Sequence, residues 1–196
     1  MAQGLRSTWR RSSPSGWADA ARPEGTRDVT CPAMIDFEAS CLPEYGQSYP
    51  IEVAVARVDG TSKTWLIRPA EAWRFWDWSP QAEALHGISR DLIASEGMDP
   101  AHVLAELTAF VGDCVVYADA DLDAYWLEVL AHAAGAKPQF PVRYLGEYMV
   151  ERGYTREQVV TALAAARERL PTEHIARDDA SRLALTVKLL LDGEPA

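Results

Sequence analysis

The sequence predicts an α/β domain in which helices flank a mixed sheet of five strands. Two apolar runs separated by Asp59-Gly60, a dipeptide typical of tight hairpin turns, indicate an antiparallel pair. Further along, a short apolar run at 114–117 leads directly into an amphipathic stretch, the order of elements that favours parallel pairing. About five strands is an ordinary sheet size.

The first half of the chain is predicted to form the hairpin and three helical segments. After a polar loop, Ile51, Val53 and Val55 alternate as in a strand. Asp99 followed by Pro100 provides an N-cap and a first-turn proline for a longer helix. The expected strands are 34–38, 51–58 and 61–68, and the expected helices are 80–85, 90–95 and 100–111.

The second half is predicted to add the parallel strands and the larger helices. Gly135 ends one helix, Thr155 caps another, and Pro171 separates the last two. No internal repeat is visible. The expected strands are 114–117 and 140–145, and the expected helices are 121–134, 146–151, 155–169 and 176–191.

Length and composition predict one globular domain in a reducing compartment. A chain of 196 residues, 48% hydrophobic, is long enough for one core and short for two. Cys31, Cys41 and Cys114 include no Cys-x-x-Cys pair, which argues against a disulfide framework or a zinc ribbon. We expect a cytoplasmic protein with no membrane partner, because there is neither an 18-residue apolar run nor the apolar core of a secretory signal.

The net charge of −10 restricts the ligands that the protein can bind. It argues against a protein that grips long duplex nucleic acid, because such binding relies on clustered lysine and arginine. A nuclease for single-stranded or short substrates is still compatible with it. Such substrates need fewer phosphate contacts, and a carboxylate metal site contributes to an acidic excess.

Residues 1–33 are rich in Arg, Ser, Gly and Pro and show no helical or strand periodicity, so we expect a disordered basic tail ahead of a domain at 34–193. Five arginines stand against three acids in this tail. One hypothesis makes Met34 the true first residue and the tail a start-site artefact. The competing hypothesis is a basic arm that contacts nucleic acid.

Two carboxylates interrupt the apolar stretch at 33–42, and the rest of the chain is arranged around them. In an extended strand Asp36 and Glu38 point to the same face, with Cα atoms about 6.6 Å apart. That geometry suits oxygen ligands converging on Mg²⁺ or Mn²⁺. The alternative is that Ile35 and Phe37 form the core face while both carboxylates face water.

Further acids and a histidine lie where strands end and helices begin, the usual ligand site in α/β sheets. Asp119, Asp121 and Asp123 follow the strand at 114–117, and one or two of them are explained equally well as partners of a helix dipole. His174 precedes Asp179 by five residues at the start of the last helix. By itself His174 is more simply explained as a partly exposed loop histidine.

With these segments in order, the chain resembles the DEDDh, or DnaQ-like, 3′→5′ exonucleases over nearly all of residues 34–193. The segment Asp-Phe-Glu-Ala-Ser-Cys-Leu is similar to the family's first motif. The resemblance implies that Asp36 and Glu38 are metal ligands. It also implies that Ser40 and Leu42 lie near the terminal nucleotide.

Residues 115–123 are similar to the second motif of the family, and this alignment places Asp123 at the position of the family's acidic ligand. The chain has Asp119 where the family often has Asn and Leu122 where an aromatic residue is frequent, so Asp119 and Asp121 remain competitors for that role. Asp178, beside Asp179, is interpreted as a solvated acid at the start of the helix.

His174 and Asp179 match the family's third motif in spacing, which implies that His174 is the general base and Asp179 the final metal ligand. A segment that is common in the family on the substrate side is matched by His86, Gly87 and Ile88.

The resemblance implies a ribonuclease H-like fold and two Mg²⁺ or Mn²⁺ ions that hydrolyse phosphodiester bonds of single-stranded or short DNA or RNA, releasing nucleoside 5′-monophosphates. Two such ions activate a water and stabilise the leaving 3′ oxygen, with Asp36 as the bridge between them. An imidazole titrates near neutral pH, so it can accept the water's proton. Two other functions stay open: a non-catalytic nucleic-acid-binding or protein-interaction domain, and a hydrolase of free nucleotides.

Four aromatic residues and an arginine lie together in the segment at 73–78. Such residues most often pack on their own domain. The alternatives are stacking on nucleic-acid bases and a contact between two copies of the chain, which would make a homodimer.

Overall fold

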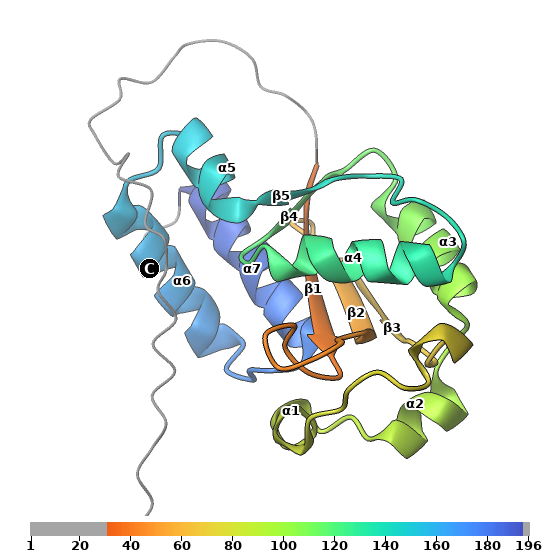
Figure 1. The fold of residues 1–196 in the computed structure, drawn as a ribbon. Coiled ribbons are helices and arrows are strands. Elements are labelled where there is room, and N and C mark those ends of the chain that lie inside the picture. Colours follow the sequence, from red (N-terminus) through yellow and green to blue (C-terminus); the bar gives the residue numbers. More distant parts are fainter. Residues whose placement is uncertain (1–30, 194–196) are drawn as a thin grey trace, which may run out of the picture.

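The computed structural model describes residues 31–193, which form one five-stranded sheet in the order β3-β2-β1-β4-β5 (Figure 1). The β1–β2 and β2–β3 pairs are antiparallel, whereas β1–β4 and β4–β5 are parallel. The predicted mixed sheet of five strands is therefore confirmed. Its strands are β1 (Pro32–Ala39), β2 (Pro50–Arg57), β3 (Ser62–Leu66), β4 (Val115–Ala118) and β5 (Val142–Tyr144).

Helices cover both faces of the sheet. One core packs α3 and α4 against one face, a second core packs α5 and α7 against the other, and α6 lies on the outer side of α7 (Figure 1). None of the helices among residues 31–193 is both long and apolar enough to span a bilayer. The helices are α1 (Pro80–His86), α2 (Arg90–Glu96), α3 (Pro100–Val111), α4 (Leu122–Ala133), α5 (Leu145–Glu151), α6 (Arg156–Arg169) and α7 (Ala176–Asp192), with a 3₁₀ turn η1 (Glu71–Trp73) before α1.

The helix boundaries follow local signals that the sequence carries. The side chain of Asp99 accepts the N–H of Ala101 at the start of α3, as expected of an N-cap. Thr155 and Gln158 form a capping box at the start of α6. The fifth strand is shorter than expected at both ends: it begins only at Val142, and α5 already begins at Leu145.

Strand alternation sends successive side chains of β1 to different cores. Ile35 and Phe37 belong to the core under α3 and α4, while Met34 belongs to the core under α7. Since side chains two apart share a face, Asp36 and Glu38 point toward α7 rather than into open water. The sequence predicted the shared face but not the helix that covers it.

Strand β1 begins earlier than expected. Its first residues pair in parallel with β4, Pro32 with Val115 and Ala33 with Val116, and both Pro32 and Ala33 are buried. A domain boundary after residue 33 therefore cuts into β1. The rest of the expected tail, residues 1–30, lies outside the described residues.

We expect a chain that starts at Met34 to be less stable than one that starts at Cys31. The shorter chain loses two buried strand residues and places a charged amino group at a buried position, which together cost about 1 to 3 kcal/mol. Urea unfolding of the two chains measures the difference. Equal midpoints would show that the first two residues of β1 contribute nothing.

The aromatic segment packs mainly on its own domain. Trp73 is 2% exposed and stacks on Tyr49 at 5.3 Å between ring centroids, and the indole N–H of Trp78 donates to Glu83. Phe75 is the exception, with 88% of its surface exposed. Base stacking or a contact with a second copy would therefore depend on Phe75.

A two-way hydrogen bond joins this segment to the loop after β1. Asp77 accepts the N–H of Gln47 at 2.8 Å through Oδ2, and its own N–H donates to the Gln47 carbonyl at 3.0 Å. Gly46 lies so close that a Cβ there would come within 2.3 Å of that carboxylate oxygen. These contacts fix the two loops to each other.

Candidate metal centre and active site

Three carboxylates meet at the carboxyl end of β1. Asp36 and Glu38 from β1 and Asp179 from α7 each offer an oxygen, and these oxygens lie within 4.8 Å of one another. Among residues 31–193 this is the one group of three such side chains close enough to share a metal ion. The structure thus brings together three of the four predicted metal ligands.

Small residues allow α7 to approach the sheet closely at this point. Ala54 and Ala56 on β2 and Ala176 and Ala180 on α7 are all buried in the shared core. Asp179, one turn into α7, therefore reaches the two carboxylates of β1.

Glu52 is a further acid beside this centre, and it was not among the site residues predicted from the sequence. It is the Cα partner of Glu38 across β1–β2, and its carboxylate accepts the N–H of Ala176 at the start of α7, at 3.2 Å. Like charges directly opposite each other in a sheet repel. The helix N–H provides a partner for Glu52, so Glu38 is the carboxylate directed to the metal centre.

Both oxygens of Asp179 already have protein partners. Oδ2 accepts the backbone N–H of His174 at 2.8 Å, and Oδ1 accepts a guanidinium N–H of Arg182. Each carboxylate oxygen has more than one lone pair, so these bonds orient the group without preventing it from binding a cation. Arg182, like Glu52, was not among the predicted site residues.

Asp123, the predicted second-motif ligand, is not one of the three carboxylates whose oxygens lie within 4.8 Å of one another. It is 3% exposed, and its Oδ1 accepts the N–H of Phe37 at 3.1 Å. Pairing of β1 with β4 ends at Met34, so Phe37 lies beyond the reach of β4 and Asp123 provides its acceptor. Burial, and then the charge of Asp123, raise the pKa of Asp36.

The two competing acids of that segment have different positions. Asp119 lines a cavity of about 430 Å³ together with Asp36, Asp179 and His174, whereas Asp121 is exposed at the start of α4. The cavity continues between α5, α6 and α7. Either Asp119 or Asp123 can therefore supply a fourth acidic group, and Asp123 remains the predicted one.

Three buried acids at this end of β1, Glu38, Asp36 and Asp123, have raised pKa values. Burial, and then the charge of Glu52, raise the pKa of Glu38 to about 8. Burial is also the first cause of the raised pKa of Asp36 and of Asp123, followed by the neighbouring aspartates. Such a cluster is costly when fully charged, and a bound cation would remove that cost.

We expect the metal-free protein to lose stability as the pH rises from about 5 to about 8. The folded state keeps protons on these acids that the unfolded chain has released, so the free energy of unfolding falls through that range. Glu38→Gln should flatten the dependence and stabilise the protein at pH 8 by about 1 to 3 kcal/mol.

Thermal unfolding in EDTA across this pH range provides the measurement, with Glu44→Gln, at an exposed position in the next loop, as the control. A slope in Glu38→Gln as steep as that of the original protein would contradict the assignment.

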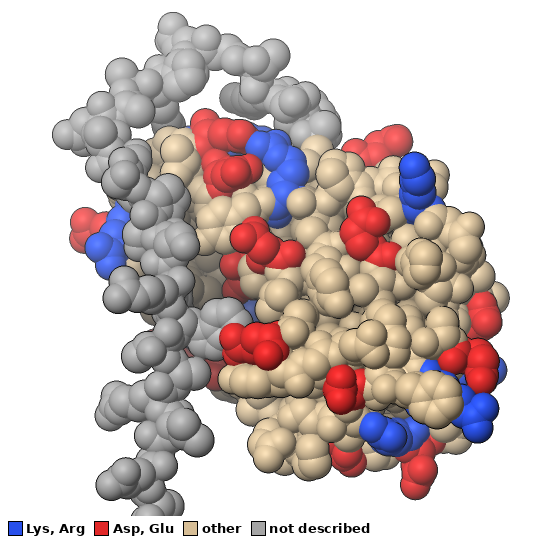
Figure 2. Space-filling model, in the orientation of Figure 1, with Lys and Arg blue, Asp and Glu red and all other residues tan. Residues whose placement is uncertain are grey.

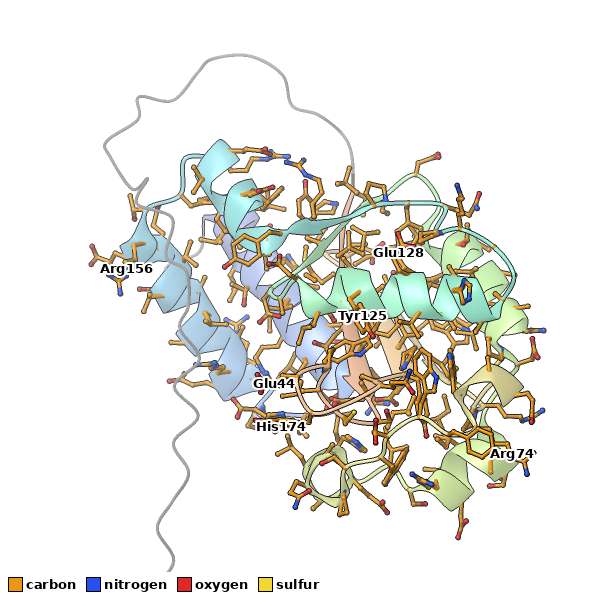
Figure 3. All side chains as sticks on the ribbon, in the orientation of Figure 1. Glu44, Arg74, Tyr125, Glu128, Arg156 and His174 are labelled. Atoms are coloured by element: carbon orange, nitrogen blue, oxygen red, sulfur yellow. The ribbon has the colours of Figure 1, made fainter. Side chains whose placement is uncertain are left out.

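His174 lies on the rim of the same cavity. It follows α6 in the connection to α7, near the carboxyl end of β1 and on the same side of the view as Glu44 (Figure 3). Its φ of 62° makes it the non-glycine residue with a left-handed backbone among residues 31–193. The imidazole is exposed, so it is accessible to a substrate or to water at the carboxylates.

The two predicted nucleotide contacts after Glu38 differ in position. The register of β1 shifts between Glu38 and Ala39, and Ser40 then turns inside, fully buried, where its hydroxyl accepts the N–H of Tyr49 at 3.1 Å. Its side chain therefore braces the following loop, and its expected place near a terminal nucleotide stays a prediction. Leu42 is half-buried and packs against the larger core.

The predicted substrate-side segment is mostly interior. His86 and Ile88 are 8% and 7% exposed, and Nδ1 of His86 accepts the N–H of Ile88 at 3.0 Å. Burial lowers the pKa of His86, which favours the neutral ring. Gly87, at the C-cap of α1 with φ 75°, is the exposed member of the three.

Comparison with known proteins gives structural matches without sequence matches. No protein-family model and no curated protein matches the sequence. Solved structures that resemble the fold include E. coli Exonuclease I in complex with a dA16 oligonucleotide, at 14% identity and a TM-score of 0.59, over 83% of this chain and 41% of that chain.

The zinc ion bound form of the E. coli ExoI–ssDNA complex is 16% identical with a TM-score of 0.58, over 84% of this chain and 41% of that one. A moderately thermophilic Exonuclease I from Methylocaldum szegediense is 14% identical with a TM-score of 0.53, over 83% of this chain and 40% of that one. This chain thus spans about two fifths of these neighbours. The fold is the ribonuclease H-like α/β fold of exonucleases, as the resemblance predicted.

Proposed function

We propose that the protein is a metal-dependent 3′→5′ exonuclease of the DEDDh type, acting on single-stranded or short nucleic acid and releasing nucleoside 5′-monophosphates. The observation that carries the proposal is the meeting of Asp36, Glu38 and Asp179 at the carboxyl end of β1, with His174 on the rim of the same cavity. The structural neighbours are exonucleases, which supports this reaction class.

The residues present fit one or two hard divalent cations, Mg²⁺ or Mn²⁺. Three carboxylate oxygens within 4.8 Å of one another are the donor type and spacing that suit such ions. Burial and the charge of Glu52 raise the pKa of Glu38 to about 8, and a bound cation would offset both effects. Asp36, Glu38 and Asp179 would hold the ions, with Asp123 as the further acid. When bound, the ions supply an activated water and neutralise charge on the phosphate and its leaving oxygen.

The protein's own groups would complete the reaction. The imidazole of His174 accepts the proton of the attacking water, and the main-chain N–H of the same residue holds Asp179 in orientation. Asp123 keeps the end of β1 in place through Phe37. The exposed Gly87 and the half-buried Leu42 are the members of the predicted substrate set that a nucleotide can reach.

The surface charge favours a short or single-stranded substrate. Acidic side chains are scattered over the face in Figure 2, and among the described residues of that face no continuous basic band is present. A protein that binds long duplex through phosphates needs such a band. The chain's net charge of −10 fits a substrate that offers few phosphates.

End-labelled DNA and RNA oligomers, single-stranded and duplex, provide the test when incubated with the pure protein and Mn²⁺. We expect stepwise shortening from the 3′ end, release of 5′-monophosphates, and loss of activity in EDTA. Binding without cleavage would favour a non-catalytic nucleic-acid-binding domain. Hydrolysis of free nucleotides or simple phosphate esters alone would favour a nucleotide hydrolase at the same centre.

A further inference from the structure

Arg182 is a buried cation at the edge of the metal centre. It lies on α7 one turn after Asp179, is 6% exposed and lines the same cavity. Its guanidinium donates in three directions: Nε to the carbonyl of Leu170 at 2.9 Å, and the two terminal nitrogens to Asp179 and to the carbonyl of Thr172.

The connection between α6 and α7 is thereby fixed at three points around His174. Arg182 holds the carbonyls of Leu170 and Thr172, and Asp179 holds the main-chain N–H of His174 at 2.8 Å. Arg182 also binds Asp179, so all three points belong to one network. The exposed His174 is anchored through its backbone and through the residues just before it.

This anchoring matters because His174 has a φ of 62°. A non-glycine residue keeps that conformation only where its surroundings determine it. We infer that Arg182 is the positioning residue for His174: by holding the 170–174 segment against α7, it sets where the imidazole stands relative to the three carboxylates. The inference rests on the proposed function for its activity readout.

Substitution of Arg182 by lysine distinguishes the effect of its positive charge from the effect of its hydrogen-bond geometry. An ammonium group can pair with Asp179, but it cannot span that carboxylate and two separate carbonyls as a planar guanidinium does. Arg182→Lys therefore keeps a cation beside Asp179 while it releases the segment that carries His174. Arg177→Lys on the same helix, where the side chain is exposed and pairs with Asp178, is the matched control.

For Arg182→Lys we expect kcat to fall by on the order of 10- to 100-fold, the usual effect of losing a partner that orients a site residue, with KM and calorimetric Mn²⁺ affinity within about threefold. Amide hydrogen exchange of residues 172–175 should accelerate about tenfold or more. Arg177→Lys should match the original protein in all four measurements. Unchanged kcat and unchanged exchange in Arg182→Lys would overturn the inference.

A double variant distinguishes positioning from a general structural role. If Arg182 acts through the imidazole, adding Arg182→Lys to His174→Ala should change kcat by no more than about twofold, because the partner is already absent. A loss as large as in the single variant would overturn the inference, since it would mean that Arg182 acts through Asp179 or through overall stability.

A second variant keeps the inference testable where Arg182→Lys does not fold. Thr172→Gly loosens the same segment at an exposed position and leaves Arg182 in place. We expect faster exchange at 172–175 together with a lower kcat, and a normal kcat despite faster exchange would count against positioning. If the original protein cleaves no substrate, the proposed function fails, whereas hydrogen exchange still reports whether Arg182 holds the segment.

Discussion

Asp36→Asn should lower the rate of nucleotide release by on the order of 10³-fold or more, since even losing a partner of a metal ligand typically costs 10- to 100-fold. Asp36 is one of the three clustered carboxylates, and its burial next to Asp123, Glu38 and Asp179 raises its pKa. An amide of the same shape removes the charge that attracts the cations. The fold should remain intact or become slightly more stable, because one member of a repelling cluster is gone.

Single-turnover cleavage with Mn²⁺, together with thermal unfolding in EDTA, measures both effects. Asp178→Asn is the control, because Asp178 adjoins Asp179 in the sequence but pairs with Arg177 and is not one of the three clustered acids. We expect this control to cleave at close to the original rate. Turnover by Asp36→Asn close to that of the original protein would contradict the proposal that the cluster is a metal centre.

His174→Ala should cost on the order of 10² to 10⁴ in rate, the usual contribution of a general base. The main-chain N–H of residue 174 still reaches Asp179 in this variant, so the carboxylate keeps its orientation and cation affinity should change little. The original rate should rise with pH, because a general base must be unprotonated to accept the water's proton. Hydroxide replaces a missing base at high pH, so the variant should regain activity there.

The measurement is a pH–rate profile of both proteins with Mn²⁺ affinity determined alongside. His102→Ala is the control, because that histidine pairs with Glu106 on the far side of the core, on α3. A His174→Ala variant with the original rate and an unchanged profile would exclude the imidazole from the reaction. The same variant with lost cation affinity would instead make it a metal ligand.

The sequence was sufficient for the elements that local chemistry determines. Asp59-Gly60 marked the hairpin, and the capped starts of α3 and α6 were correct because side-chain caps are local interactions. The start of β1 was missed. Pro32 has no N–H for a sheet ladder and usually marks a break, yet as the first residue of a strand it is tolerated.

Site residues whose positions follow from spacing along the chain could be predicted from the sequence. Residues whose roles depend on how a helix packs on the sheet could not. Alternation put Asp36 and Glu38 on one face, and the resemblance supplied Asp179. Glu52 and Arg182 were missed because their roles depend on which helix covers that face. A glutamate between apolar strand residues and an arginine one turn after an aspartate both have the pattern of surface residues.

The link between Gly46 and Asp77 restricts how this protein can vary among related sequences. A Cβ at position 46 would lie 2.3 Å from the Asp77 carboxylate, which itself accepts the N–H of Gln47. Any side chain at 46 would have to push that carboxylate away and break the bond between the two loops. Positions 46 and 77 should therefore change together during evolution, and an insertion in one loop would require a compensating change in the other.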